Sequence, residues 1–87
     1  MEFEFDPAKN KANLEKHGIG FDEAKALWLD VDALERPARN EGEVRKMLVS
    51  KYGGKLWAAI FTEREDKVRI ISVRRAHKKE ETLYEKR

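Results

Sequence analysis

The sequence contains no cysteine, so it can form neither a disulfide bond nor a thiolate metal site. It also lacks a long apolar run, since no stretch approaches the roughly 20 residues that a helix needs to cross a bilayer. The opening segment MEFEFDPAK has neither the basic nor the apolar region of a secretion signal. We therefore expect a cytoplasmic protein with no membrane partner.

Several common catalytic motifs are missing as well. The sequence has no glycine-rich phosphate loop, no serine nucleophile elbow and no group of histidines and carboxylates at metal-ligand spacing. We accordingly expect no cofactor and no metal. With 87 residues, of which 40% are hydrophobic and 41% charged, the chain fits a single domain over residues 1–87, with a modest core and a heavily charged surface.

The net charge of +2 hides a strong asymmetry along the chain. Residues 1–43 hold six Lys or Arg and eleven Asp or Glu, a net charge of −5, whereas residues 44–87 hold thirteen and six, a net charge of +7. A basic half of this kind indicates an anionic partner, and nucleic acid is the commonest one. The alternative is that the two halves attract each other within the fold.

The N-terminal half is predicted to contain a strand and two helices. Residues 2–5 alternate polar and apolar side chains, which is typical of a short half-buried strand. Asp6 is a suitable N-cap and Pro7 a suitable first residue for a helix that runs to about His17, where Gly18 ends it. A second helix follows, and its buried face is formed by residues at helical spacing: Phe21, Ala24, Leu27 and Trp28.

The C-terminal half is predicted to be mainly strands. The apolar runs at residues 47–49, 56–61 and 68–73 are separated at hairpin spacing by Gly53-Gly54 and Glu65-Asp66. Residues 30–43 are interpreted as a short strand and a mobile loop, and residues 76–87 as a helix with a thin apolar stripe. The order β-α-α-β-β-β-α predicts an α+β fold, with a small, mostly antiparallel sheet and helices on one face.

Candidate functional residues lie at the ends of these elements: Lys16, His17, Glu63, Arg64, Arg74 and Arg75. Each has a purely structural explanation too. Lys and His at a helix C-terminus favour the macrodipole, and adjacent Glu and Arg can form an ordinary surface ion pair. Arg74-Arg75 is the least ordinary pair, because successive strand side chains point to opposite faces and one guanidinium then faces a substrate.

Two motifs make the chain resemble the BrnT toxin family from end to end. They are N-x-x-K-H-G-x-x-F-x-E-A at residues 13–24 and T-E-R-x-x-x-x-R-I-I-S-x-R-x-A at residues 62–76. The resemblance implies a RelE-like fold and a ribonuclease activity that arrests growth by blocking translation. His77 and Phe61 depart from the family pattern, in which a small hydroxyl residue and Tyr are expected.

The resemblance also implies partners. A BrnA-type antitoxin with a ribbon-helix-helix DNA-binding part would neutralise the toxin, and the complex would bind operator DNA and repress its own operon. Because ribbon-helix-helix proteins dimerise, we expect two copies of each chain in the complex.

Metal-independent RNA cleavage suits these residue types. A base takes the proton of the ribose 2′-hydroxyl, cations stabilise the phosphorane and an acid protonates the departing 5′-oxygen. We predict phosphate binding and transition-state stabilisation by Arg64 and Arg74, which stay charged and can grip two phosphate oxygens at once. The candidates for proton transfer are His17, Glu63 and Tyr84. The predicted contacts to backbone phosphates are Lys16, Arg45, Arg69 and Arg75.

Two other functions are compatible with the same residues. A non-catalytic RNA- or DNA-binding module would use the basic half without a positioned acid and base. A protein-interaction domain would present the basic surface to an acidic partner.

Overall fold

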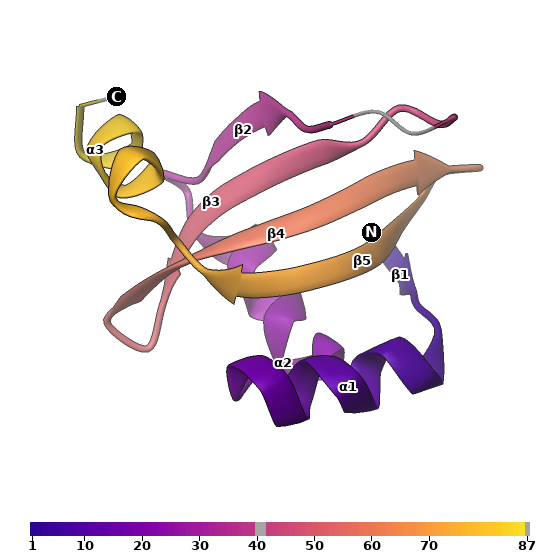
Figure 1. Ribbon diagram of the computed structural model, residues 1–87. Helices are drawn as coiled ribbons and strands as arrows, with labels where there is room; N and C mark the ends of the chain where they lie inside the picture. Colours follow the sequence, from indigo (N-terminus) through magenta and orange to yellow (C-terminus); the bar gives the residue numbers. More distant parts are fainter. Residues whose placement is uncertain (40–41, 87) are drawn as a thin grey trace.

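The computed structural model describes residues 1–39 and 42–86. The elements in chain order are β1 (Glu2–Glu4), α1 (Pro7–His17), α2 (Phe21–Ala24), the 3₁₀ helix η1 (Lys25–Leu29), β2 (Leu34–Pro37), β3 (Lys46–Tyr52), β4 (Lys55–Arg64), β5 (Lys67–Arg75) and α3 (Lys78–Lys86). A five-stranded sheet in the order β1-β5-β4-β3-β2 forms the centre of the molecule (Figure 1). β1 pairs with β5 in parallel and the other three pairings are antiparallel. The predicted α+β class is confirmed.

The strand count differs from the predicted order, which included only four strands. The short strand expected after residue 30 is present as β2 and pairs with β3 at the edge of the sheet. Residues 40–41 of the expected loop, and residue 87 of the expected terminal helix, lie outside the described residues.

Helix α1 begins and ends where its capping residues predicted. The Asp6 side chain accepts a hydrogen bond from the Ala8 amide at 2.8 Å, and Pro7 is the first helical residue. Gly18 ends the helix in the left-handed region with φ of 75°, and its amide donates to the Leu14 carbonyl at 3.0 Å. Because glycine has no Cβ, it adopts this conformation without steric penalty.

The two predicted hairpins are also present. Gly53 and Gly54 both have positive φ between β3 and β4, as the two-residue turns that match strand twist require. Glu65 and Asp66 adopt positive φ between β4 and β5. These turns fix the register of the three longest strands.

The main core lies between the sheet and the segment from α1 to η1. Phe21, Ala24 and Leu27 are fully buried, as their helical spacing predicted, although the helix tightens to 3₁₀ geometry after Ala24. Trp28 packs edge-on against Phe61 at 5.2 Å between ring centroids. The layer from α1 to η1 thus shields most of the apolar side chains on this face of the sheet from water.

Asn13 joins α1 to the sheet through three buried hydrogen bonds. Its Nδ2 donates to the carbonyls of Ile19 and Val73, both at 2.9 Å, and its Oδ1 accepts from the Val73 amide at 3.0 Å. A buried amide satisfied in this way fixes the helix relative to β5, because every lost bond would leave a desolvated polar group. The first motif therefore contains a structural residue.

Helix α3 does not share a face with the other helices, so the expectation that all helices pack on one face is wrong for α3. Tyr84 is 6% exposed and packs with Val49 and Leu56. Strand alternation places those two residues on the sheet face opposite α1, because their neighbours Leu48 and Trp57 contact the main core. α3 covers only one corner of this second face (Figure 1). No helix in residues 1–39 or 42–86 has the length and apolar character needed to span a membrane.

Candidate active site

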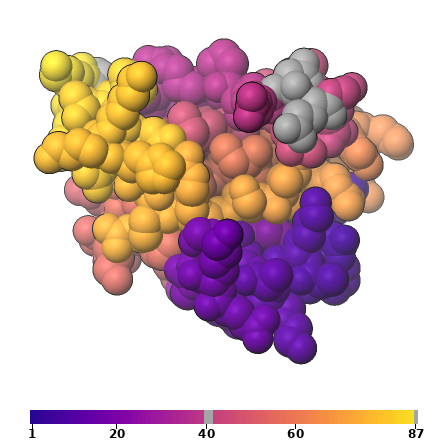
Figure 2. Space-filling view, in the orientation of Figure 1, coloured from indigo at the N-terminus to yellow at the C-terminus, as the bar shows by residue number. Residues whose placement is uncertain are grey.

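The sheet face opposite α1, α2 and η1, here called the open face, carries a row of arginines. Register and alternation place on it Arg36, Arg45, Arg64, Arg69 and Arg74. In Figure 2 the strands reach the surface between α3, in yellow, and the segment leading into β3. The structure thus brings together on one surface four of the residues predicted to contact RNA.

A β-bulge is needed for this grouping. Ile60 pairs with Ser72 but Phe61 pairs with Ile70, so Ile71 is an extra residue in β5. Arg69 and Arg74 are five residues apart, and plain alternation would point them to opposite faces. The extra residue brings both onto the open face.

A cluster of charges, here called the Arg64 cluster, lies at one end of β3 and β4. Its members are Glu43, Arg45, Lys46, Glu63 and Arg64. Arg64 Nη2 lies 3.1 Å from Glu43 Oε2, and Lys46 Nζ lies 2.6 Å from Glu63 Oε1. A cavity of about 410 Å³ is lined by four of them, Glu43, Lys46, Glu63 and Arg64, together with Val44 and Thr62. Carboxylates and cations therefore meet at one accessible site.

The electrostatics of the Arg64 cluster favour charged side chains. The hydrogen bond to Glu63 and the charge of Glu35 raise the pKa of Lys46 above its ordinary value. Arg64 and Glu63 are more than half exposed, and ion pairs with that much exposure contribute only about 0–1 kcal/mol. Arg45 Nε is buried without a hydrogen-bond acceptor, and Glu43 Oε1 is 4.0 Å from it. A phosphate could replace these carboxylate partners at little energetic cost.

Arg74 has a stronger partner at the other end of the open face. Its two Nη atoms donate to the two carboxylate oxygens of Glu80 on α3, both at 2.8 Å. The pair is only partly exposed, and the hydrogen bonds from Arg74 lower the pKa of Glu80 while raising that of Arg74. Glu80 also accepts from the His77 amide at 2.8 Å, which helps to begin α3.

Arg64 and Arg74 lie far apart although they share a face. Arg74 pairs with Ala58, six residues from Arg64 along β4, which corresponds to about 20 Å at 3.3 Å per residue. Their guanidinium groups also turn toward carboxylates on different elements. The two arginines therefore lie toward opposite ends of the open face.

Two other predicted residues of this side have defined contacts. Arg69 pairs with Glu4 of β1 at 3.3 Å. The Tyr84 hydroxyl donates to Asp30 Oδ2 at 2.8 Å, beneath α3. Burial alone would raise the pKa of Asp30, but hydrogen bonds from the Lys51 and Asp32 amides and from Tyr84 and Ser50 outweigh it and lower the pKa. Tyr84 consequently serves to hold α3 on the sheet.

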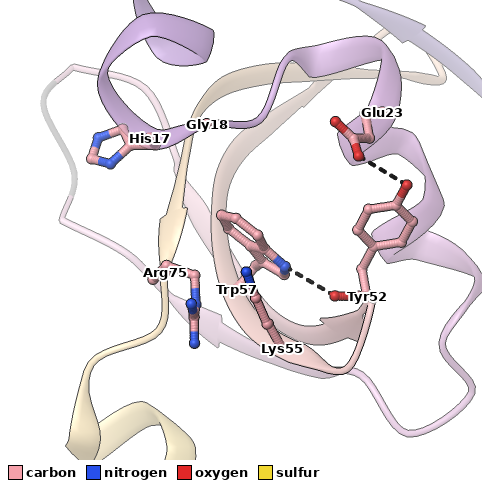
Figure 3. A pocket seen from close by; sticks show the side chains of 8 residues that line it. His17, Gly18, Glu23, Tyr52, Lys55, Trp57 and Arg75 are labelled. Carbon is pink, nitrogen blue, oxygen red and sulfur yellow. Dashed lines mark hydrogen bonds between the residues drawn. The ribbon is translucent and has the colours of Figure 1, made fainter.

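His17 and Arg75 lie on the other side of the sheet, in what we call the Trp57 pocket. This cavity of about 340 Å³ is lined by His17, Gly18, Glu23, Tyr52, Gly53, Lys55, Trp57 and Arg75 (Figure 3). Arg75 is consecutive with Arg74 but points away from the open face, as alternation requires. Lys16 precedes His17 on α1 and is exposed. The predicted residues are thus divided between two surfaces.

One comparison with known proteins decides the family. Residues 5–80 match the model of the ribonuclease toxin BrnT of type II toxin–antitoxin systems. The chain belongs to the BrnT family. A search of curated proteins found no match. Membership makes the chain a ribonuclease toxin of a type II toxin–antitoxin system, with RNA as its substrate and an antitoxin as its partner.

Several residues of this BrnT-family chain that the structure places at these sites were not predicted from the sequence. They are Glu43 and Lys46 in the Arg64 cluster, Glu80 at Arg74, and Lys55 and Trp57 in the pocket. No local motif distinguishes them from other surface charges, because each becomes significant only through a partner on another element. Over the described residues, no three His, Asp or Glu side chains are grouped to hold a metal ion.

Proposed function

We propose that this chain cleaves RNA without a metal at the Arg64 cluster, where Arg64 on the open face meets Lys46 and Glu63 on the opposite face at the ends of β3 and β4. The observation that carries the proposal is the joint placement of Glu63, Lys46 and Arg64 around one cavity. A carboxylate, an ammonium and a guanidinium supply a proton acceptor, a proton donor and a fixed positive charge. Those are the three requirements of 2′-hydroxyl attack on a phosphodiester.

The proton movements follow from the contact between Glu63 and Lys46. Glu63 takes the proton of the 2′-hydroxyl as its oxygen attacks phosphorus, and Arg64 neutralises the charge that develops on the phosphorane oxygens. Protonation of Glu63 removes the negative charge that held the Lys46 proton, so the pKa of that ammonium falls. Lys46 then gives a proton to the departing 5′-oxygen, and Glu63 returns one to Lys46. The products are a cyclic phosphate and a free 5′-hydroxyl.

The other arginines of the open face bind the strand away from the reacting bond. Arg45 lies within the Arg64 cluster, Arg69 lies beside it, and Arg74 lies about 20 Å along the face at 3.3 Å per residue of strand. Phosphates replace Glu4 and Glu80 as their partners. Within this proposal, Tyr84 acts by positioning α3, and His17 lies outside the reaction centre.

Cleavage by the purified chain in EDTA tests the metal-free mechanism. We expect the same rate of RNA degradation in 5–10 mM EDTA, an ordinary chelating excess, as in magnesium, because the Arg64 cluster supplies the charge that a metal would otherwise provide. Loss of cleavage in EDTA with recovery in magnesium would contradict it. Glu63→Gln should lower kcat by about 10²-fold, and Glu65→Gln in the adjacent turn serves as the control.

The cellular function proposed here follows the family. Cleavage of RNA blocks translation and thereby arrests growth. The α+β fold that carries this activity is of the RelE-like type. A BrnA-type antitoxin neutralises the chain, and the complex of two copies of each protein represses its own operon by binding operator DNA through ribbon-helix-helix segments.

The open face is the proposed site of neutralisation. An acidic antitoxin segment would replace the carboxylates that pair the arginines in the free chain, and the basic C-terminal half would steer it there. Hydrogen exchange with and without the antitoxin should show protection in β3 to α3. Protection restricted to residues 1–39 would mean that the antitoxin binds the opposite side.

A further inference from the structure

The cations of the Trp57 pocket differ from Arg64, Lys46 and Arg74 in having no acidic partners among the described residues. Within the described residues, Lys55 and Arg75 have no carboxylate at ion-pair distance, and His17 makes no hydrogen bond through its side chain. The carboxylate that lines the pocket, Glu23, accepts a hydrogen bond from the Tyr52 hydroxyl at 3.0 Å. An anion entering this pocket would therefore not have to displace an internal one.

Arg75 is held in place for such an anion. Its Nε donates to the Leu56 carbonyl at 3.3 Å, and its guanidinium carbon lies 5.5 Å from the centre of the Trp57 ring. The Trp57 indole is itself fixed by a hydrogen bond from its Nε1 to the Tyr52 carbonyl at 3.2 Å (Figure 3). These contacts orient the guanidinium and leave its Nη atoms for a ligand, which reduces the entropy lost on binding.

The size of the pocket and its position fit a single nucleotide. A volume of about 340 Å³ is at the lower end of the range for small-ligand sites. Arg74 and Arg75 are adjacent at the end of β5 and point to opposite sides of the sheet. An RNA strand bound to Arg74 on the open face reaches the Trp57 pocket by passing over the end of this one strand.

We propose that the Trp57 pocket binds one nucleotide of the single-stranded RNA substrate, with its phosphate on Lys55 and Arg75 and its base against the His17 imidazole. Unpaired bases that stack on aromatic or histidine side chains are the usual targets of proteins that bind single-stranded RNA. This inference rests on the proposed function, since it takes RNA as the substrate. It adds a second contact that holds the strand at the end of β4 away from the reaction.

Binding of a non-cleavable RNA tests the pocket. A 2′-O-methyl oligonucleotide of about ten residues lacks the attacking hydroxyl, and its affinity can be followed by fluorescence anisotropy over a range of salt concentrations. The double variant Lys55→Gln/Arg75→Gln should bind it at least tenfold more weakly, and the salt slope should fall by about 0.7, because the contact to one phosphate is lost. The control Lys78→Gln/Lys79→Gln removes the same charge from exposed positions on α3 and should change the slope little.

A second readout follows the pocket directly. In a Trp28→Phe background, Trp57 is the remaining tryptophan, and its emission should change when the oligonucleotide binds to the otherwise unmodified chain. Equal affinity of the double variant and the control, with an unchanged Trp57 emission spectrum, would show that the Trp57 pocket does not bind the RNA. That result would leave RNA binding by the open face intact. Failure of the unmodified chain to bind the oligonucleotide at all would overturn the proposed function together with this inference.

Discussion

The Arg64 cluster and the Trp57 pocket lie at opposite ends of β4, and both present cations to solvent, but they differ in what accompanies those cations. In the Arg64 cluster, Glu43 and Glu63 contact Arg64 and Lys46 directly. In the pocket, Lys55 and Arg75 have no carboxylate partner among the described residues. Reaction chemistry needs a proton acceptor beside a positive charge, whereas binding needs only the charge.

The same contrast separates the two adjacent arginines of β5. Arg74 is held by two hydrogen bonds to Glu80, so an RNA phosphate must displace that carboxylate to bind there. Arg75 is held by a carbonyl and an aromatic ring, and neither competes with phosphate for its Nη atoms. Variants that affect one surface and spare the other can therefore break or sharpen the comparison.

The largest effect is expected for Arg64→Ala. If the Arg64 cluster is the reaction centre, kcat for RNA cleavage should fall by about 10²–10³-fold, because a fixed charge aimed at the phosphorane is lost. Binding of the 2′-O-methyl oligonucleotide should change by only a few-fold. Steady-state cleavage and anisotropy would separate the two quantities. Lys11→Ala, on the exposed side of α1, is the control. Full kcat in Arg64→Ala would show that the Arg64 cluster is not the reaction centre.

Asn13→Ala should have the next largest effect, on stability. It leaves the Val73 amide and the Ile19 and Val73 carbonyls without their partner, which costs about 2–4 kcal/mol of unfolding free energy. Urea denaturation measures the loss. Asn10→Ala is the matched control, since it removes one partly buried hydrogen bond, which Asn10 Oδ1 accepts from the Phe21 amide, and should cost about 1 kcal/mol. Similar losses for the two variants would contradict the role assigned to Asn13.

Arg74→Ala and Glu80→Gln should have smaller and opposite effects on binding. Arg74→Ala removes a phosphate contact remote from the reaction and should raise KM about tenfold with little change in kcat. Glu80→Gln frees Arg74 while keeping an acceptor for the His77 amide, and should tighten oligonucleotide binding about two- to fivefold. Glu85→Gln, exposed on the same helix, controls for the change in net charge. Weaker binding by Glu80→Gln would show that Glu80 supports the site instead of competing with RNA.

The smallest effect is expected when the pH is lowered, and it concerns the stability of α3 on the sheet. The folded-state pKa values of Asp30 and Glu80 are both lowered, so the stability that they contribute is present above their ordinary values and is lost as pH falls through the folded ones. Below about pH 4, protonation should weaken the contacts of Tyr84 and Arg74 that hold α3. Hydrogen exchange of α3 would then increase before that of β4. Asp30→Asn should flatten this dependence, and an unchanged acid response in the variant would exclude Asp30 as its source.

Local sequence was enough to determine the ends of α1, both hairpin turns and the buried face of α2 and η1. The reason is that each depends on a few neighbouring residues. Asp6 and Gly18 cap α1, Gly53 and Gly54 adopt the positive φ that the turn requires, and the residues from Phe21 to Trp28 recur at helical spacing. The family motifs contained about half of the residues that the two surfaces use, among them Arg64, Arg74 and His17. The composition of the C-terminal half indicated an anionic partner but not where it binds.

Tertiary structure alone decided how those residues are grouped. The extra residue Ile71 turns Arg69 onto the face of Arg74, and the length of β4 separates Arg74 from Arg64. Helix α3 packs on the open face because its Tyr84 side chain packs against Val49 and Leu56 on that face. Each of these outcomes depends on pairings between residues far apart in the chain, and a single-residue shift in register reverses the face of every side chain beyond it.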